Sequence, residues 1–495
     1  MELMYKSTRG RGELITASEA IIKGIADDKG LFVPVEIPKL DLSLKEMKEF
    51  DYCKLTKFIL KKFLMDFSES EIEDCVKKAF EKNFESKEVV KLSKVSDEFF
   101  LELYHGPTLA FKDVALSLLP HLLKTAMKKH NIKKEIVILT ATSGDTGKAA
   151  LEGFKDLEQI KIIVFYPDEG VSQIQKMQMI TQDGNNTSVV AINGNFDDAQ
   201  NGVKMIFNDE QYKEFLAHNN YILSSANSIN IGRLIPQIVY YFYSYLQLLV
   251  KNEIDNGDLI NVVVPTGNFG NILAGFFAKQ MGLPINRLIC ASNENNVLYD
   301  FINSGVYDGC RELKKTISPS MDILISSNLE RLNYYLSNEN EERIKELMGK
   351  LSSDCKYEID QKMKDGLKLF HAGFATELDT IKSIKEIFDK FNYCVDTHTA
   401  VAWYVYNKYK KETGDATKTV IVSTASPFKF AKVVCQGLGL DVKGKDDFEA
   451  MDEIAKLKLL KIPSSIHNLR NKEVRHKEVC DKESMKDYIN QFLNI

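Results

Sequence analysis

One lysine stands where a helix is expected to begin, in the segment HGPTLAFKD (105–113). Lys112 follows a Gly-Pro turn and precedes the amphipathic stretch VALSLLPHLLKTAMKKH. The positive end of a helix dipole disfavours an ammonium ion, and it lowers the pKa of a lysine placed there, as burial also does. Only a neutral amine attacks a carbonyl, so this position suits a lysine that forms a Schiff base. The alternative is a solvated lysine beside Asp113.

A glycine-rich turn at residues 266–271 follows the apolar run VVVP and opens the helical stretch ILAGFFAKQ. Backbone N–H groups at a helix N-terminus bind phosphate, and glycines let the phosphate approach them closely. The turn TGNFGN therefore predicts a phosphate site. The alternative is a turn that only connects a strand to a helix.

A second turn, TSGDTG at residues 142–147, also joins a strand to a helix. It differs from a nucleotide P-loop because Gly144 lies only three residues before Gly147 and because Ala149 follows the lysine. ATP is therefore not favoured. The hydroxyls of Ser143 and Thr146, with the free N–H groups of the turn, suit a small carboxylate.

A third polar segment, NSINIGR at residues 227–233, leads into the apolar helix LIPQIVYYFYSYLQLL. An arginine at this position could hold a second phosphate through two parallel hydrogen bonds. The alternative is a helix capped by Asn or Ser, with Arg233 on the surface.

The elements that must position these segments alternate between strand and helix. Apolar strands are expected at 135–141, 161–167, 188–193 and 259–265, and each is followed by a Gly, Asn or Ser turn that opens a helix. Strand–helix alternation predicts a mostly parallel, doubly wound α/β fold. Such sheets bind ligands at the carboxyl ends of their strands, where these turns lie.

The flanking regions have a different texture. Residues 1–95 and 340–395 are rich in charge and helical in pattern, 419–427 is a further buried strand with a polar end, and the tail from 441 is helical. We expect an N-terminal mostly helical domain (1–97), a large α/β domain (98–134 and 230–440), a small α/β domain (135–229) and a C-terminal helical extension (441–495).

Composition excludes several classes of protein. The 495 residues carry a formal net charge of −5, which argues against general attraction to nucleic acid or to an anionic membrane. No apolar run reaches the length of a membrane-spanning helix, and the N-terminus lacks the apolar core of a secretory signal. The eight cysteines form no CxxC pair, so we expect free thiols, no metal site and a cytoplasmic location.

Taken together, the segments resemble the threonine synthase family, in its longer microbial and fungal type. These are pyridoxal-phosphate enzymes of the β-family, or fold type II. The resemblance runs in order along nearly the whole chain through the blocks YKSTRG, HGPTLAFKD, ATSGDTG, YPDEGVSQIQKMQM, NSIN-x-x-R, VVVPTGNFGNILAGFFAKQMGLPI, SPSMDILISSNLERL, DTHTAV and STASPFKF.

The resemblance implies a role for each matching residue. Lys112 carries pyridoxal phosphate as a Schiff base. Thr424 meets the pyridine nitrogen, and a hydroxyl there leaves that nitrogen largely unprotonated. The remaining site residues fall into three groups: Gly267, Asn268, Phe269, Gly270 and Asn271 for the cofactor phosphate; Ser143, Gly144, Asp145 and Thr146 for the substrate carboxylate; Ser228, Asn230 and Arg233 for the substrate phosphate.

The reaction implied is the conversion of O-phospho-L-homoserine and water to L-threonine and phosphate, by elimination at Cγ and water addition at Cβ. The small-molecule substrate would be bound by a monomer or small homo-oligomer. A phospho-amino-acid lyase or a serine/threonine dehydratase on the same scaffold, and a non-catalytic relative that only binds ligand, are the alternatives. Fold alone does not separate them.

This chain departs from the family pattern at a few positions that concern turn shape. Lys29 interrupts a turn that is usually Asp-Gly-Gly-Leu, and Asn271 stands where some relatives have aspartate. Further departures are Thr397 in place of proline, Ser426 in place of histidine and Phe428 in place of alanine. For His105 and His398 we expect packing and hydrogen bonding near the site.

Overall fold

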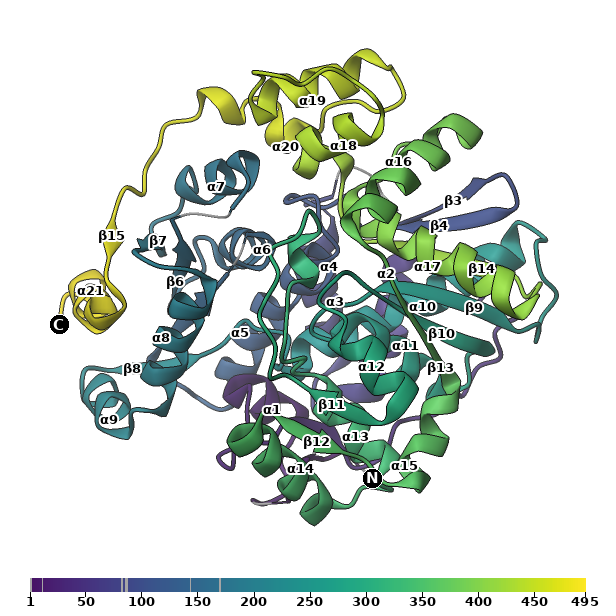
Figure 1. Ribbon diagram of the computed structural model, residues 1–495. Coiled ribbons are helices and arrows are strands. Elements are labelled where there is room, and N and C mark those ends of the chain that lie inside the picture. Colours follow the sequence, from purple (N-terminus) through teal and green to yellow (C-terminus); the bar gives the residue numbers. More distant parts are fainter. Residues whose placement is uncertain (1, 11, 82, 85–87, 143, 169–170) are drawn as a thin grey trace.

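A computed structural model of the chain describes all residues except 1, 11, 82, 85–87, 143 and 169–170 (Figure 1). Two sheets, each built mainly from parallel strands with helices on both faces, form two lobes that lie side by side. The predicted fold class, mostly parallel doubly wound sheets in two lobes, is confirmed.

The larger sheet has six strands. Five adjacent strands run parallel to one another, an arrangement that requires long crossover connections such as helices. Only the last pair, at one edge, is antiparallel. In spatial order the strands are β13 (Phe370–Phe374), β10 (Ile285–Ser292), β9 (Ile260–Pro265), β14 (Thr419–Ser423), β4 (Glu98–Glu102) and β3 (Lys91–Val95). The runs INVVVP and TVIVS are buried along their whole length, as strands covered on both faces must be.

The smaller sheet has five parallel strands. Their order is β15 (Val479–Cys480), β7 (Thr187–Ile192), β6 (Ile160–Pro167), β5 (Glu135–Ala141) and β8 (Tyr221–Ser224). The strands predicted at 135–141, 161–167, 188–193 and 259–265 all form, with ends that differ by no more than one residue.

Helices cover both sheets. Those of the smaller lobe are α6 (Asp145–Phe154), α7 (Gln173–Ile180), α8 (Phe196–Asn208) and α9 (Glu210–His218). Those around the larger sheet are α4 (Lys112–Leu116), α5 (Leu119–Lys129), α10 (Ile231–Val250), α11 (Gly270–Met281), α12 (Val297–Ser304), α16 (Glu377–Phe391), α17 (Thr397–Thr413) and α18 (Ala431–Gly437). The helix α10 is apolar around nearly its whole circumference and is buried almost throughout, between α2 and α11.

The first 95 residues are only partly helical. The helices α1 (Ala17–Lys23), α2 (Tyr52–Phe63) and α3 (Glu69–Phe80) form as expected, because each has an apolar stripe and a Thr, Asp or Ser cap. The strands β1 (Tyr5–Ser7) and β2 (Phe32–Pro34) pair with each other, and β3 joins the larger sheet. The expectation of a mostly helical region is therefore only partly right, because the helical pattern at 44–50 forms turns and three strands were missed.

The expectation of a purely helical region at 340–395 is wrong. It contains α14 (Glu341–Asp354), α15 (Gln361–Gly366) and α16, but β12 (Lys356–Glu358) and β13 interrupt them. The strand β13, with the sequence FHAGF, pairs with β10 at the edge of the larger sheet. Between β10 and this region lie β11 (Val306–Asp308), the single turn η1 (Pro319–Met321) and α13 (Leu329–Leu336).

The C-terminal segment contacts both lobes. After η3 (Pro427–Phe430) and α18, the helices α19 (Asp447–Lys456) and α20 (Ser464–His467) pack over the larger lobe, and the chain then crosses to the smaller one (Figure 1). There β15 adds an edge strand beside β7, and α21 (Met485–Leu493) packs on the smaller sheet. The predicted helical tail is thus only partly right, because β15 and irregular segments such as 457–463 and 472–478 separate its helices. The division into four domains stays a prediction.

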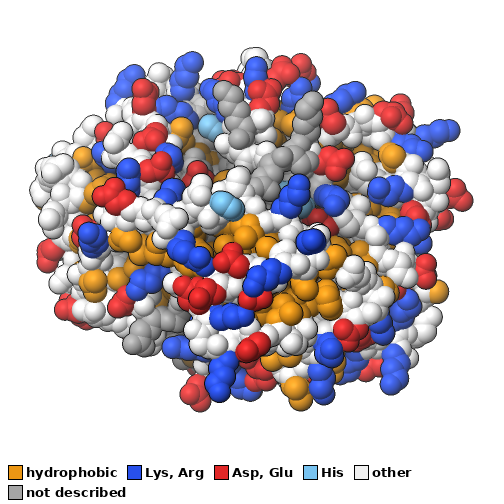
Figure 2. Space-filling model, turned by 90° about the horizontal axis from the view of Figure 1, so that it is seen from above, with side chains coloured by type: hydrophobic (Ala, Val, Ile, Leu, Met, Phe, Trp, Pro, Cys, Tyr) orange, Lys and Arg blue, Asp and Glu red, His pale blue; other side chains and the backbone are white. Residues whose placement is uncertain are grey.

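The surface mixes charges of both signs. On the face shown in Figure 2, lysine and arginine side chains alternate with aspartate and glutamate, with hydrophobic side chains between them. Among the described residues, no helix combines the length and the apolar character that crossing a membrane requires. All eight cysteines are free thiols, as expected.

Candidate active site

Lys112 is the first residue of α4, a helix that packs against α6 of the smaller lobe and α10 of the larger one. Its segment is tied to the end of β14, because the Phe111 N–H donates to the Thr424 carbonyl at 2.8 Å and Ala110 forms a β-bridge with Ala425. The Lys112 side chain is only 13% exposed. The alternative of a solvated lysine is therefore wrong.

Burial of Lys112 favours its neutral form. Burial lowers the pKa of Lys112 to about 8; the nearby Asp145 opposes this shift, and the cations of Lys429 and Arg233 add to it. The carboxylate oxygen Oδ2 of Asp145 lies 3.8 Å from Lys112 Nζ. An amine with such a pKa is neutral often enough near pH 7 to act as a nucleophile or a base.

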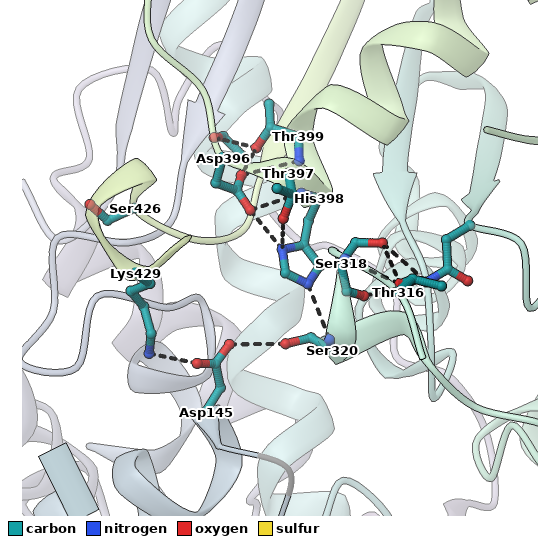
Figure 3. Close-up of polar contacts among 12 residues, drawn as sticks. Asp145, Thr316, Ser318, Ser320, Asp396, Thr397, His398, Thr399, Ser426 and Lys429 are labelled. Atoms are coloured by element: carbon teal, nitrogen blue, oxygen red, sulfur yellow. Dashed lines mark hydrogen bonds and ion pairs between the residues drawn. The ribbon is translucent and has the colours of Figure 1, made fainter. Parts of the chain in front are cut away.

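Asp145, the first residue of α6, meets groups from both lobes (Figure 3). Its Oδ1 accepts a hydrogen bond from Gln175 at 2.8 Å and pairs with Lys429 Nζ at 2.6 Å, and its Oδ2 accepts from the Ser320 hydroxyl at 3.0 Å. Burial would raise the pKa of Asp145, but Lys429 and Lys112 more than offset this and hold it well below its usual range. The carboxylate is thus ionised and occupied by donors of the protein.

The rest of the predicted carboxylate loop is tightly folded. The hydroxyl of Thr142 accepts from the N–H groups of Gly144 and Gly147, at 2.9 and 3.0 Å. Thr146 lies half-buried on the first turn of α6, and Ser143 lies outside the described residues. Lys148, the lysine that follows Gly147, forms an ion pair with Glu152 at 2.9 Å and so stabilises α6 locally.

The glycine turn joins β9 to α11 with its donors free. No backbone N–H group of Gly267–Asn271 has an acceptor among the described residues. Two carbonyls of the turn face away, because Ser326 donates to Gly267 and Asn328 donates to Asn268. Phe269 has φ 62°, a left-handed conformation that turns the chain into the helix. The turn therefore presents a row of free donors at a helix N-terminus, which is the geometry of a phosphate site.

Asn271 adds a side-chain donor to this row. Its Oδ1 accepts hydrogen bonds from the hydroxyls of Tyr240 and Tyr241, both at 2.8 Å. These two bonds leave Nδ2 as a buried donor with no partner among the described residues. A buried amide nitrogen without an acceptor is costly, so Nδ2 is suited to an acceptor that the described residues do not supply.

Arg233 is buried on the first turn of α10, with 3% of its surface exposed. One nitrogen, Nη1, donates to the Ala226 carbonyl at 2.7 Å, while Nε has no partner within the described part of the chain. Burial lowers the pKa of Arg233 to about 10. The surface-arginine alternative is wrong, and a buried guanidinium with a free donor suits an anion.

The other two residues predicted for the substrate phosphate are engaged by the protein. Asn230 caps α10 by accepting from Gly232 at 2.9 Å, and its amide donates to the Ile21 carbonyl at 3.0 Å. The Ser228 hydroxyl accepts from Asn328 at 3.2 Å. The structure therefore brings Arg233 to the site with a free donor, but it commits the Asn230 side chain to holding α1 and α10 in place.

Sequence reasoning missed Lys429 and Ser320. Lys429 follows the strand β14 in η3, is completely buried and donates to the Thr108 carbonyl at 2.8 Å as well as to Asp145. A lysine within the apolar run SPFKF was the available signal. The Ser320 N–H donates to His398 Nε2 at 3.2 Å, and His398 Nδ1 lies 2.7 Å from Asp396 Oδ2 (Figure 3). His398 is thereby held between two partners, one at each ring nitrogen.

The remaining predicted residues lie as follows. Thr424 is buried at the end of β14, next to the Lys112 segment. His105 contacts Glu102 through Nε2 at 2.8 Å, in agreement with a hydrogen-bonding role. The site as a whole gathers three cations, Lys112, Lys429 and Arg233, around the two buried carboxylates of Asp145 and Asp113, so positive charge is in excess and favours anionic ligands.

The site lies between two doubly wound lobes and combines a lysine of lowered pKa with a helix N-terminus whose N–H groups have no acceptor among the described residues. This combination defines the class of fold type II pyridoxal-phosphate enzymes. The general model of a pyridoxal-phosphate dependent enzyme matches residues 85–361. The models for the threonine synthase N terminus and the threonine synthase C-terminal region match residues 4–80 and 399–489.

Individual proteins agree with these matches. Threonine synthase of Saccharomyces cerevisiae is 35% identical, over 99% of this chain and 98% of the yeast protein. The crystal structure of pyridoxal-phosphate-bound threonine synthase from Brucella melitensis superposes with a TM-score of 0.87 at 32% identity, covering 100% of both chains. The yeast enzyme gives the same TM-score at 31% identity, over 99% of each chain. The chain belongs to the threonine synthase family.

A further group of relatives is longer. Human threonine synthase-like 1 is 39% identical over 85% of this chain, but the match spans only 58% of the human protein. Family membership therefore leaves the activity of this chain to be argued from its own site.

Proposed function

We propose that this protein converts O-phospho-L-homoserine and water into L-threonine and phosphate, with pyridoxal phosphate bound at Lys112. The observation that carries the proposal is the presence of two separate anion sites at one lysine. No described residue accepts from the N–H groups of the glycine turn, which can bind one phosphate. None accepts from Nε of the buried Arg233, which is close enough to lower the pKa of Lys112 and can bind another. A cofactor phosphate accounts for only one of them.

The residues present fit pyridoxal phosphate. The backbone of Gly267, Asn268, Phe269, Gly270 and Asn271 would hold its phosphate, with the unpartnered Asn271 Nδ2 as a further donor. Lys112 would bind its aldehyde carbon, and the Thr424 hydroxyl would meet its ring nitrogen. When bound, the cofactor supplies an electron sink for the charge left behind when the substrate loses its Cα proton.

The protein's own groups move the proton and hold the anions. Lys112 Nζ, once displaced by the substrate amine, is a base of suitable pKa to accept the Cα proton. Arg233 binds the substrate phosphate and retains it after the C–O bond at Cγ breaks. The N–H groups of Asp145 and Thr146 at the start of α6, together with the hydroxyls of Thr146 and Ser143, orient the substrate carboxylate.

The Ser320 segment limits the entry of water. Its carbonyl lies so close to Gly267 that a Cβ on that glycine would approach it to 2.8 Å, and its hydroxyl reaches across to Asp145 in the other lobe. Water must add to Cβ only after phosphate has left, so a contact that joins the two lobes over the site favours threonine over premature side reactions.

Two further proposals concern oligomeric state and cellular location. The chain binds a small-molecule substrate, and we propose a monomer or small homo-oligomer in the cytoplasm. Eight free thiols support a reducing compartment.

Product analysis tests the proposed function. Purified protein with pyridoxal phosphate should release phosphate and threonine from O-phospho-L-homoserine in equal amounts. Phosphate without threonine would identify a phospho-amino-acid lyase, and turnover of free serine or threonine at a higher kcat/KM would identify a dehydratase. Absence of all three reactions in protein that binds pyridoxal phosphate would leave a ligand-binding relative.

A further inference from the structure

The carboxylate of Asp145 lies between two lysines but belongs mainly to one of them. Lys429 Nζ lies 2.6 Å from Oδ1, whereas Lys112 Nζ lies 3.8 Å from Oδ2. The Ser320 hydroxyl occupies the Oδ2 side at 3.0 Å. Asp145 is therefore a direct partner of Lys429 and only a distant one of Lys112.

Burial of the Lys429 ammonium group is energetically unfavourable. Its side chain is 0% exposed, and its ammonium group contacts only Asp145 and the Thr108 carbonyl in the described part of the structure. A buried charge requires strong partners, and an ion pair of this kind is seldom the most stable arrangement that a protein interior allows. Its position next to the predicted cofactor lysine points to a role in setting the charge of that lysine.

The charged groups that face Lys112 come from four elements. Asp145 begins α6, Lys429 lies in η3, Arg233 lies in the first turn of α10, and Asp113 lies next to Lys112 in α4. Asp113 is held by Thr108, whose N–H donates to Oδ2 at 2.9 Å. Two cations thus repel a proton on Lys112, and the nearer anion is shared with Lys429.

We propose that Lys429 is a positioning residue that holds the Asp145 carboxylate on its own ammonium group and so keeps Lys112 free to lose its proton. If Lys429 were absent, Asp145 would become the unshared partner of Lys112 and would stabilise its ammonium form. This inference rests on the proposed role of Lys112 as the cofactor lysine.

The test is the pH dependence of cofactor attachment. Full-length protein freed of cofactor is mixed with limiting pyridoxal phosphate between pH 6 and pH 10, and the rate at which the near-visible absorbance band grows is recorded. This rate follows the neutral fraction of Lys112. For the wild type we expect a midpoint near the lowered pKa of about 8.

Three variants separate the charges. Lys429→Met removes the cation with little change of shape, and the midpoint should rise by about one to two pH units, which slows attachment near pH 7 by roughly 10- to 100-fold. Asp145→Asn should lower the midpoint, and the double variant should return it toward the wild-type value. Lys148→Met, which removes a buried lysine that pairs with Glu152, is the matched control and should leave the midpoint unchanged.

A purely structural role for Lys429 predicts a different result. Lys429→Met would then lower the Tm and leave the midpoint where it is, and this outcome would overturn the proposal. If Lys429→Met does not fold, Asp145→Asn decides, because an unchanged or raised midpoint contradicts the same proposal. Borohydride reduction and peptide mapping accompany each measurement. An adduct on another lysine would contradict the proposed function of Lys112 instead.

Discussion

Two buried arginines show how single residues divide between structure and function. Arg331, in α13, is fully buried, and its guanidinium donates to the Phe32 carbonyl, to the Asn328 side chain and to the Ile229 carbonyl. Within the described part of the chain, Arg233 has one such partner and a free Nε. A guanidinium with all its nitrogens engaged holds segments together, whereas one with a free donor next to other cations is arranged for a ligand.

Arg233→Ala should lose most of its activity on O-phospho-L-homoserine. A charge-assisted pair to phosphate contributes about 1.5–3 kcal/mol, or roughly one to two powers of ten in kcat/KM. Arg233→Lys should recover only part, because lysine restores the charge but not the planar fork. Steady-state kinetics with phosphate and threonine as separate readouts measure the loss. Wild-type kinetics in Arg233→Ala would return this residue to a structural role.

Lys112 should carry the cofactor. The purified protein should show a near-visible absorbance band, and borohydride reduction should place a stable adduct on Lys112, because its amine is the one that burial and neighbouring cations bring near neutrality. Lys112→Ala should lose both the band and the adduct. A labelled peptide that contains Lys148 or Lys429 instead of Lys112 would contradict the assignment.

At the scale of elements, the site is built from turns at the carboxyl ends of strands. The strand β5 ends in the turn that starts α6, β9 ends in the glycine turn that starts α11, and β14 ends next to Lys112. Parallel strands bring their carboxyl ends to one edge of a sheet, so segments far apart in the sequence meet there. Turn geometry then decides which N–H groups stay free.

Gly270→Ala should weaken cofactor binding without weakening the fold. A methyl group on Gly270 would meet the protein only at 3.4 Å and beyond, but it would occupy space at the free N–H groups of the turn. We expect at least a tenfold rise in the Kd for pyridoxal phosphate, measured by fluorescence or absorbance titration, at an unchanged Tm of the cofactor-free protein.

Gly349→Ala is the matched control for this substitution. Gly349 lies inside α14 with no atom within 4 Å of an added Cβ, so alanine should stabilise the helix by about 0.5–1 kcal/mol and leave the Kd unchanged. An unaltered Kd in Gly270→Ala would mean that the glycine turn does not bind the phosphate.

The turn before β2 contains backbone strain at Lys29, a position where the sequence departs from the family pattern. Lys29 has φ 65° at the position where the family usually has glycine. Because a left-handed conformation costs a side-chain-bearing residue about 1–2 kcal/mol, and glycine adds some loss of chain entropy, Lys29→Gly should stabilise the protein by roughly 0.5–1 kcal/mol. The same change at the exposed Lys77 inside α3 should destabilise it by a similar amount, as urea denaturation would measure. Equal effects at both positions would contradict this account.

At the scale of the whole molecule, the C-terminal segment ties the two lobes together. After leaving the larger lobe it donates from Arg475 and His476 to the Ile180 carbonyl at the end of α7, pairs as β15 with β7, and ends as α21 on the smaller sheet. Its apolar side chains complete the core on one face of that sheet. The hydrophobic core of the smaller lobe therefore includes residues from the C-terminal end of the chain.

Ile489→Ala should destabilise the smaller lobe. Ile489 is completely buried in the cluster that α21 shares with the smaller sheet, so its truncation should cost about 2–5 kcal/mol. Hydrogen exchange should localise the loss to β5, β6 and β7. Val479→Ala, at a side chain 52% exposed on β15, is the control and should change little. Loss of stability spread evenly over both lobes would show that they unfold as one unit.

The sequence by itself determined the local elements and the principal chemistry. Continuous apolar runs such as EIVILTA and the turns that follow them act through neighbouring residues only, so β5, β6, β7 and β9 and the position of Lys112 at a helix start were predictable. The charged neighbours of β13 hid it, because an edge strand of five residues between amphipathic helices has too short a pattern to stand out.

Tertiary structure decided which polar groups are left without a partner. Asn230 and Arg233 lie three residues apart and looked equally available, yet α1 takes the amide of Asn230 while no described residue takes Nε of Arg233. In the same way, Lys429 and Asp145 are 284 positions apart and meet only because β14 and β5 end at the junction of the two lobes. Partnership and burial arise from contacts between distant segments, and these set the charge of Lys112.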